Sequence, residues 1–349
     1  MKNLKDIFEG ILDKNNKNNV GKATVNDIII EYINEHYCVN GTIEIHKLID
    51  DDPKYEEWKR GRYQVKIVGN LDVKDRTLTT LTHDLFYFWI VTGNFECKFV
   101  NLENLHGAPT NVYGKVEIGY IPTLTSLEGF PLNITGRCKI SSLPKIKGFS
   151  EIHKSNLMGG IYISCMNIKS LDGIHLCSGN GDVPIEINCC SNLTTLTGIH
   201  YDNVKCTSVY LSELPKLKSL NGLPDQIYRG KDDYGEIDLL DLNITNLVGC
   251  PSVSHGLEVT RCKKLTSGKG SPKKILNSTV GIRFDRCPNL ETLDMDTDIV
   301  NGGFGVTECP KLKSFENCPK IIDGNVYCDG RFKEKDVITY CKKLYGSVY

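Results

Sequence analysis

Residues 309–320 read CPKLKSFENCPK, and residues 214–225 repeat nearly the same phrase as LPKLKSLNGLPD. Aligning the whole chain on the shared pattern L-x-x-L gives eleven anchor positions that lie 21 to 27 residues apart. The anchors are Leu78, Leu102, Leu124, Ile146, Ile168, Leu193, Leu217, Ile244, Leu265, Leu290 and Leu312. Leu or Phe stands three positions after ten of the eleven anchors, and a Gly suited to a turn stands five positions after seven of them. Repeats of this length are typical of elongated, stacked folds.

A short alternating segment precedes each anchor and predicts a β-strand whose every second side chain points inward. The inward pairs are Leu71/Val73, Phe95/Cys97, Val116/Ile118, Cys138/Ile140, Ile161/Ile163, Ile185/Ile187, Val209/Leu211, Ile237/Leu239, Leu257/Val259, Ile282/Phe284 and Phe304/Val306. All twenty-two residues are apolar. A unit with one such strand cannot bury its apolar side alone, so each unit must stack on its neighbours.

We therefore predict a repeat solenoid of about 11 coils, with one parallel β-sheet, a short N-terminal helical cap and a C-terminal helix-strand cap. The N-terminal cap is predicted from the amphipathic segment 24–37 with Thr24 as N-cap, and the C-terminal cap from a helix near 333–343. The predicted domains are a docking helix at 1–13, a flexible linker at 14–23, the N-terminal cap at 24–64, the solenoid at 65–322 and the C-terminal cap at 323–349.

The stretch 309–328, CPKLKSFENCPKIIDGNVYC, resembles a divergent leucine-rich-repeat-like branch of the form C-P-x-L-x-S-L-x-G-C-P-x-x-x-G-x-x-x-C, common in gut bacteria and their tailed phages. The resemblance covers roughly residues 65 to 330 and implies the architecture, while leucine-rich repeats serve many partners. The chain lacks the Asn ladder of the better-known form. The resemblance also implies a setting, because similar tethered N-terminal helices and Cys-Pro repeats occur in phage-encoded proteins.

Charge and cysteine content narrow the class of protein. Lys plus Arg is 42 and Asp plus Glu is 43, so no net field favours nucleic acid or an anionic membrane. The N-terminus has Asp6, Glu9 and Asp13 where a signal peptide would be apolar, and no run of about 18 apolar residues occurs. The fifteen cysteines are expected to be free thiols in a reducing compartment. We expect a protein of the virion or of the cytoplasm of the infected host bacterium.

The first residues predict a short docking helix. Apolar side chains stand at i, i+3, i+4, i+7 and i+8, namely Leu4, Ile7, Phe8, Ile11 and Leu12. The polar segment 14–22, KNNKNNVGK, follows as a tether. The helix either docks on another protein or folds back on the N-terminal cap.

The residue between each inward pair is predicted to face solvent on the sheet. This row contains Glu96, Glu117, Lys139, Tyr162, Glu186, Tyr210, Asp238, Glu258 and Arg283, with Asp72 before it and Gly305 after it. Solenoids often bind partners on this face, so the row predicts a basic or mixed partner. A solvated charged surface is the simpler alternative.

We predict no cofactor, no metal and no catalytic site. G-x-S-x-G, H-E-x-x-H and Walker motifs are absent from the sequence. His153, His175 and His200 each stand seven residues after an anchor, and two of them could share a metal ion with Cys177, but exposed corner residues are the favoured interpretation. Cys262, Cys287 and Cys309 align in the same manner and are expected to be buried thiols.

The expected function is non-enzymatic protein binding, by a phage virion-associated or packaged protein docked through its N-terminal helix. One alternative is an intracellular inhibitor or regulator that captures a host protein on the acidic sheet face. A second alternative is a glycan-binding adhesin, which would use Tyr162 and Tyr210 as aromatic platforms. The partner is expected to be a virion component or a host protein. The oligomeric state stays open.

Overall fold

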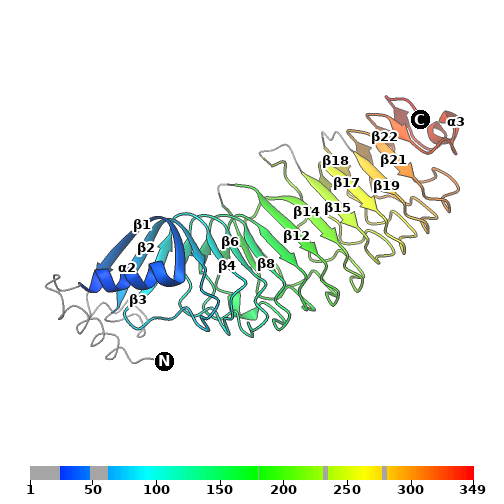
Figure 1. Cartoon of the computed structure of the whole chain (residues 1–349). Coiled ribbons are helices and arrows are strands. Elements are labelled where there is room, and N and C mark those ends of the chain that lie inside the picture. The colour runs from blue at the N-terminus through cyan, green and yellow to red at the C-terminus, as the bar shows by residue number, and fades with distance from the viewer. Residues whose placement is uncertain (1–23, 48–61, 180, 231–234, 277–280) are drawn as a thin grey trace. The chain divides into compact units, whose positions relative to one another are not determined.

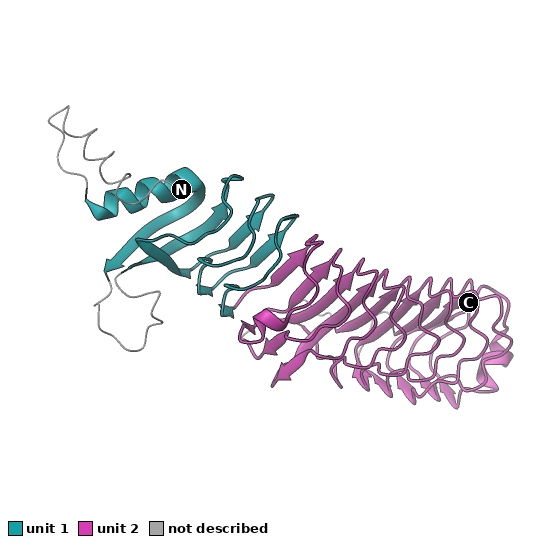
Figure 2. Cartoon of the chain, turned by 90° about the horizontal axis from the view of Figure 1, so that it is seen from below, with its two compact units in different colours: residues 1–134 teal, residues 135–349 magenta. Residues whose placement is uncertain are grey.

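Each turn of the chain contributes one principal strand to a parallel β-solenoid of about twelve turns, which confirms the predicted fold class (Figure 1). The computed structural model describes residues 24–47, 62–179, 181–230, 235–276 and 281–349. The chain divides into two units, Met1–Ile134 and Thr135–Tyr349 (Figure 2). Among the described residues, no helix is both long and apolar enough to cross a membrane.

The first unit begins with the predicted helical cap. Helix α2 (Val25–His36) starts at Thr24, whose hydroxyl accepts a hydrogen bond from the backbone N–H of Asp27, while the Asp27 carboxylate accepts one from the backbone N–H of Thr24. The helix buries Ile28, Ile29 and Ile33. A long antiparallel pair, β1 (Tyr37–Lys47) and β2 (Tyr63–Val73), follows. The remaining strands of the unit are β3 (Phe86–Val91), β4 (Phe95–Lys98), β5 (Asn111–Val112), β6 (Val116–Gly119) and β7 (Asn133–Ile134).

The second unit stacks its strands in parallel and in register. Its principal strands are β8 (Cys138–Ser141), β10 (Ile161–Ser164), β12 (Val183–Asn188), β14 (Cys206–Ser212), β15 (Glu236–Leu240), β17 (Gly256–Thr260), β19 (Ile282–Asp285), β21 (Phe304–Thr307) and β23 (Val326–Tyr327). The return segments add short strands that the sequence did not predict: β9 (Asn156–Leu157), β11 (His175–Cys177), β13 (His200–Asp202), β16 (Val253–Ser254), β18 (Lys274–Ile275), β20 (Ile299–Val300), β22 (Ile321–Ile322) and β24 (Lys343–Leu344). Strands β16, β18, β20, β22 and β24 form a separate parallel sheet.

The interior is built as the alternation predicts. Each of the twenty-two inward residues is at most 2% exposed. The anchors from Leu102 to Leu312 are buried as well, but Leu78 in the first coil is only partly so, and Leu81 is the buried residue there. The corner before Leu78 is held by polar contacts instead, because Asp75 accepts hydrogen bonds from the backbone N–H and the hydroxyl of Thr77 at 2.8 and 2.7 Å.

Two backbone corners with positive φ recur along the coils. The seven predicted corner glycines have φ between 89° and 108°, which confirms their role as turn residues; they are Gly107, Gly129, Gly173, Gly198, Gly222, Gly249 and Gly270. A second corner, just after the principal strand, uses residues other than glycine with φ of 51–57°: Phe99, Tyr120, Ser142, Cys165, Cys189, Glu213, Asp241, Arg261, Arg286 and Glu308. This conformation costs about 1–2 kcal/mol per residue. Backbone hydrogen bonds to the next coil offset it, as from the N–H of Ser142 to the Ser164 carbonyl at 3.0 Å.

The C-terminal cap has the predicted order of helix and strand, but the helix is shorter than expected. Helix α3 spans Glu334–Ile338. It ends early because the chain turns back to continue the separate sheet at β24, where the N–H of Lys343 donates to the carbonyl of Lys320 at 3.1 Å. Phe332 covers the last coil, with its ring 4.9 Å from that of Phe315.

Candidate functional site

The predicted solvent-facing residues form ladders in register on the principal strands. In the first unit, Asp72, Glu96 and Glu117 are aligned. In the second unit the aligned residues are Lys139, Tyr162, Glu186, Tyr210, Asp238, Glu258 and Arg283. We call these seven residues the sheet face. The alignment of the repeats predicted that these residues would lie side by side, because side chains alternate between the two faces in the same way along every principal strand.

The last residues of the predicted solvent-facing row, beyond Arg283, differ from the prediction. Gly305 is buried rather than solvent-facing, because it has no side chain and the Cγ atom of Arg283 lies 3.5 Å from where its Cβ would stand. Tyr327 on β23 is the next residue in register and is 48% exposed. Strand spacing in the sequence did not identify Tyr327, since the eleven predicted strands stop one coil earlier.

In the first unit, a lysine partly neutralises the acidic ladder. Lys98 lies on the same side of β4 as Glu96, and its Nζ is 2.8 Å from Glu96 Oε2 and 3.3 Å from Glu117 Oε2. Both carboxylates raise the pKa of Lys98 through hydrogen bonds, with burial opposing them. This ladder therefore presents a mixed surface rather than an acidic one.

At the start of the sheet face, cations surround Tyr162. Arg137 lies 5.5 Å and the Lys139 ammonium 5.3 Å from the centre of the Tyr162 ring. Arg137 also forms an ion pair with Glu186 at 2.5 Å, and the side chain of Asn188 donates to the Tyr162 hydroxyl at 3.2 Å. These contacts fix the ring of Tyr162 and cover it, which makes the ring a poor stacking platform for a sugar.

Farther along, three carboxyl groups gather on the outer side of β15 and β17. Glu236 and Asp238 are two residues apart on one strand, and Glu258 is in register with Asp238. Burial, and after it the charges of Glu236 and Glu258, together raise the pKa of Asp238 to about 7. The pKa of Glu236 is also raised, first by burial and then by Glu258. We call these three residues the acidic triad.

The raised pKa of Asp238 predicts a dependence of stability on pH. Since the folded state binds the proton more tightly than the unfolded state, stability falls as the pH rises from about 4 to about 7 and then levels off. We expect Asp238→Asn to raise the free energy of unfolding by about 2 kcal/mol at pH 8, allowing for partial exposure, and by less at pH 5. Urea denaturation at both pH values measures this.

Asp298→Asn is the matched control for that experiment. The Lys320 ammonium lowers the pKa of Asp298, so removing its charge is expected to give no gain in stability at pH 8. An equal gain for both variants would show that the acidic triad carries no electrostatic strain.

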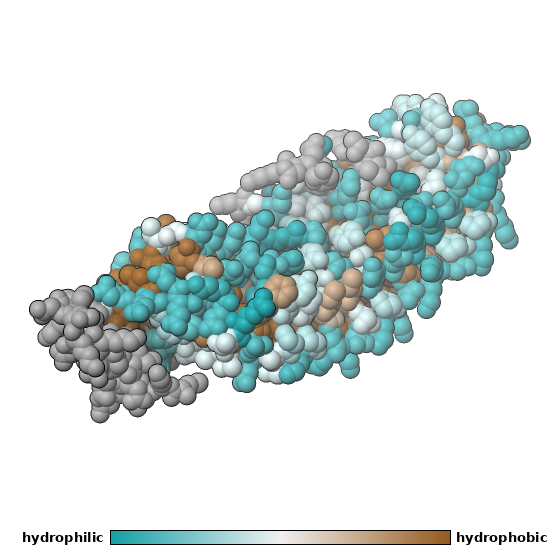
Figure 3. Space-filling model, in the orientation of Figure 1, coloured by the Kyte–Doolittle hydropathy of each residue, from teal (hydrophilic) through white to brown (hydrophobic). Residues whose placement is uncertain are grey.

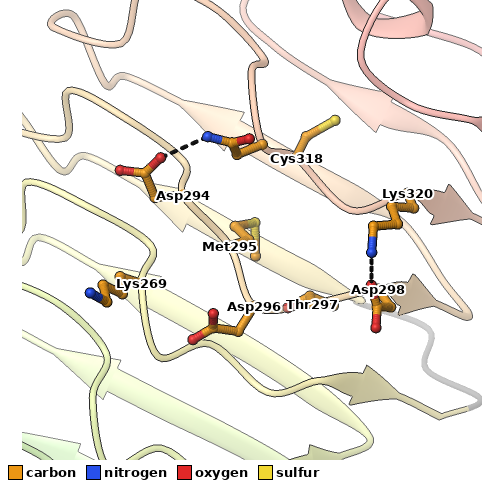
Figure 4. A pocket seen from close by; sticks show the side chains of 9 residues that line it. Lys269, Asp294, Met295, Asp296, Thr297, Asp298, Cys318 and Lys320 are labelled. Carbon is orange, nitrogen blue, oxygen red and sulfur yellow. Dashed lines mark hydrogen bonds and ion pairs between the residues drawn. The ribbon is translucent and has the colours of Figure 1, made fainter.

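A hollow in the second unit gathers charged groups (Figure 4). It has a volume of about 550 Å³ and is lined by Lys269, Asp294, Met295, Asp296, Thr297, Asp298, Asn317, Cys318 and Lys320. The Asn317 amide donates to Asp294 at 2.9 Å, and the backbone N–H of Gly270 donates to Asp296 at 2.8 Å. Hydrogen bonds from Thr292 and Asn317 lower the pKa of Asp294, so it is ionised at neutral pH and cannot act as a general acid.

Sequence reasoning missed the side chains at the second corner. In the first unit, Phe99 and Tyr120 are 54% and 47% exposed and stack with their ring centres 4.8 Å apart. In the second unit, the Arg261 guanidinium donates to both carboxylate oxygens of Asp241, at 2.6 to 3.1 Å. The signal was present, because each of these residues stands two positions after the second inward residue of its strand.

The histidine row differs from the predicted one. His175 and His200 are in register, but the residue aligned with them in the preceding coil is Asn156 rather than His153. A short 3₁₀ turn, Ser150–Ile152, lengthens that return by several residues, and His153 Nδ1 lies 2.7 Å from the carbonyl of Ser150. Counting from the anchors assumed returns of equal length, and this assumption was wrong here.

The cysteines of the described chain are free thiols. Cys262, Cys287 and Cys309 are fully buried, as expected, and their Sγ atoms lie near backbone carbonyls of their own or adjacent coils. The predicted docking residues Leu4 to Leu12 lie outside the described residues.

Comparisons with protein-family models, with curated proteins and with solved structures find no match for this chain.

Proposed function

We propose that this chain is a non-enzymatic scaffold that binds another protein through the sheet face. The observation that carries the proposal is the in-register ladder from Lys139 to Arg283, which presents seven side chains of varied chemistry on one rigid sheet. A sheet whose inward residues are fully buried holds such side chains at fixed spacing. Because the spacing is already fixed, less conformational entropy is lost when a partner binds.

The acidic triad indicates which kind of partner suits this face. Burial and the neighbouring negative charges raise the pKa of Glu236 and of Asp238, so a positive charge placed beside these carboxyl groups would be stabilised. Tyr210 lies between Glu186 and Asp238 in the ladder and supplies an aromatic contact. The surface visible in Figure 3 is mostly hydrophilic over the second unit, which also favours a polar partner. A protein with a basic patch fits these features.

A quantitative capture experiment tests the proposal. The tagged chain is incubated with particles or lysate of the organism that encodes it, and bound proteins are quantified by mass spectrometry. We expect one partner to be depleted at least tenfold by the joint changes Glu186→Ala, Tyr210→Ala and Glu258→Ala, all on the sheet face. The control is Lys274→Ala, an exposed position on β18 in the separate sheet, which is expected to leave the partner unchanged. Equal capture by both variants contradicts the proposal.

The proposed setting is the particle of a tailed phage, with residues 1–13 docking the chain to it. The support is the apolar stripe from Leu4 to Leu12 and the polar tether that follows, both features of the sequence. Deleting residues 1–13 is expected to abolish co-purification with the particle while leaving the circular dichroism of the solenoid intact. Unchanged co-purification rules out the docking role.

The acidic triad equally suits capture of a host protein by an intracellular inhibitor, and the capture experiment separates the two settings by the identity of the depleted protein. The glycan-binding alternative has less support, because Arg137 and Lys139 cover the ring of Tyr162.

A further inference from the structure

Two short strands of the second unit place metal-binding side chains next to one another. Strand β11 reads His175-Leu176-Cys177, and β13 reads His200-Tyr201-Asp202. The strands are parallel, with His175 opposite His200 and Cys177 opposite Asp202. The middle residue of β11, Leu176, points inward, since it is fully buried. The four outer residues therefore form a two-by-two array on the surface.

The distances within this array suit a single metal ion. The Sγ atom of Cys177 lies 3.5 Å from Nε2 and 3.7 Å from Nδ1 of His175. Ligand atoms of His175, Cys177 and Asp202 all lie within 4.8 Å of one another. Tetrahedral zinc, with bonds of about 2.3 Å to sulfur and about 2.0 Å to nitrogen, separates these two ligand atoms by roughly 3.5 Å.

We propose that His175, Cys177 and Asp202 bind a zinc ion and that His200 supplies the fourth ligand. The centres of the His175 and His200 rings are 4.9 Å apart. A rotation of the exposed His200 side chain therefore brings one of its ring nitrogens to the fourth corner of the zinc tetrahedron. Thiolate and imidazole ligands select zinc over magnesium and calcium, which prefer oxygen ligands. Cysteine loses its thiol proton to solvent when the ion binds.

A neighbouring amide is placed to orient one of the ligands. The Asn203 side chain donates to Asp202 Oδ1 at 3.1 Å. Hydrogen bonds of this kind fix ligand orientation in metal sites. Cys177 itself is only 9% exposed, so it lies at the base of the array. Because the ligands come from two successive coils, a bound ion joins these coils and stabilises the folded state.

The test uses the full chain purified without a histidine tag, because such a tag binds zinc itself. The protein is equilibrated with zinc sulfate, freed of excess metal by gel filtration and analysed for zinc. We expect one zinc ion per chain, and a rise in melting temperature on adding zinc that a chelator reverses. Cobalt substitution is expected to give a thiolate-to-cobalt charge-transfer band, which reports the Cys177 ligand directly.

Variants distinguish this site from adventitious binding. We expect Cys177→Ser to lose the charge-transfer band, and Asp202→Asn and His200→Ala to weaken zinc binding at least tenfold. The last two residues are exposed, so these changes leave the fold intact. The controls are His153→Ala and Cys165→Ser, which change an exposed histidine and an exposed cysteine outside the array and should retain zinc. Absence of stoichiometric zinc in the unmodified chain overturns the proposal, as does zinc retained by Cys177→Ser or lost by Cys165→Ser.

Discussion

Phe304→Ala is expected to open the C-terminal coils roughly 150-fold to 5,000-fold more often than in the unmodified chain. The Phe304 side chain is fully buried on β21, and its ring packs edge-on against Phe315 at 6.1 Å. Truncating such a side chain removes about 3–5 kcal/mol, because both transfer energy and a cavity contribute. In a stacked repeat the loss is felt mainly in the neighbouring coils.

Hydrogen exchange read by mass spectrometry measures this effect on β21 and β23. The control is Phe99→Ala, which removes a phenylalanine that is 54% exposed and is expected to change exchange of its own strand, β4, by less than tenfold. A comparable loss of protection in both variants would mean that the alternating residues do not form the interior.

Gly222→Val is expected to destabilise the second unit by about 4 kcal/mol. Gly222 has a φ of 108°, a conformation that residues with a Cβ atom rarely adopt. A Cβ atom there would stand 2.4 Å from the carbonyl carbon of Leu196 in the preceding coil. Both the strained backbone and the overlap act in the same direction, and neither is relieved by moving a flexible side chain.

The matched control is Gly181→Val. Gly181 is exposed, and a Cβ atom added to it would meet nothing within 4 Å. We expect this variant to retain the urea midpoint of the unmodified chain, while Gly222→Val lowers it. Equal urea midpoints for the two variants would contradict the conclusion that successive coils approach so closely at this corner that only glycine fits.

The strands could be predicted from the sequence because their signal is local. Alternation of apolar residues, as in Ile185 and Ile187, requires only that one side of each strand be buried, and this holds in every coil. The corner glycines could be predicted for the same reason, since a fixed offset from the anchor marks a fixed turn. The positions of the sheet-face residues could be predicted from the strands and the corner glycines together, because strands that lie at the same distance from their anchors are in register.

The features that escaped prediction depend on contacts between coils. The second strands contain as few as two residues, such as Lys274–Ile275, and two residues show no period. A hydrogen bond to the next coil stabilises the positive φ of Ser142 or Arg261, so no particular residue type is needed there, and the sequence signal is its fixed place two residues after the inward pair. The misplacement of His153 came from the length of its own return, which one short 3₁₀ turn changes.

Site-specific photo-cross-linking tests the central claim, that a partner protein occupies the sheet face. A photoreactive phenylalanine analogue replaces Tyr210 on β14 in one variant and the exposed Lys274 on β18 in another. After irradiation with the particles or lysate, we expect one protein to be cross-linked at position 210 and none at position 274. Cross-linking of the same protein at position 274, with none at position 210, would contradict it.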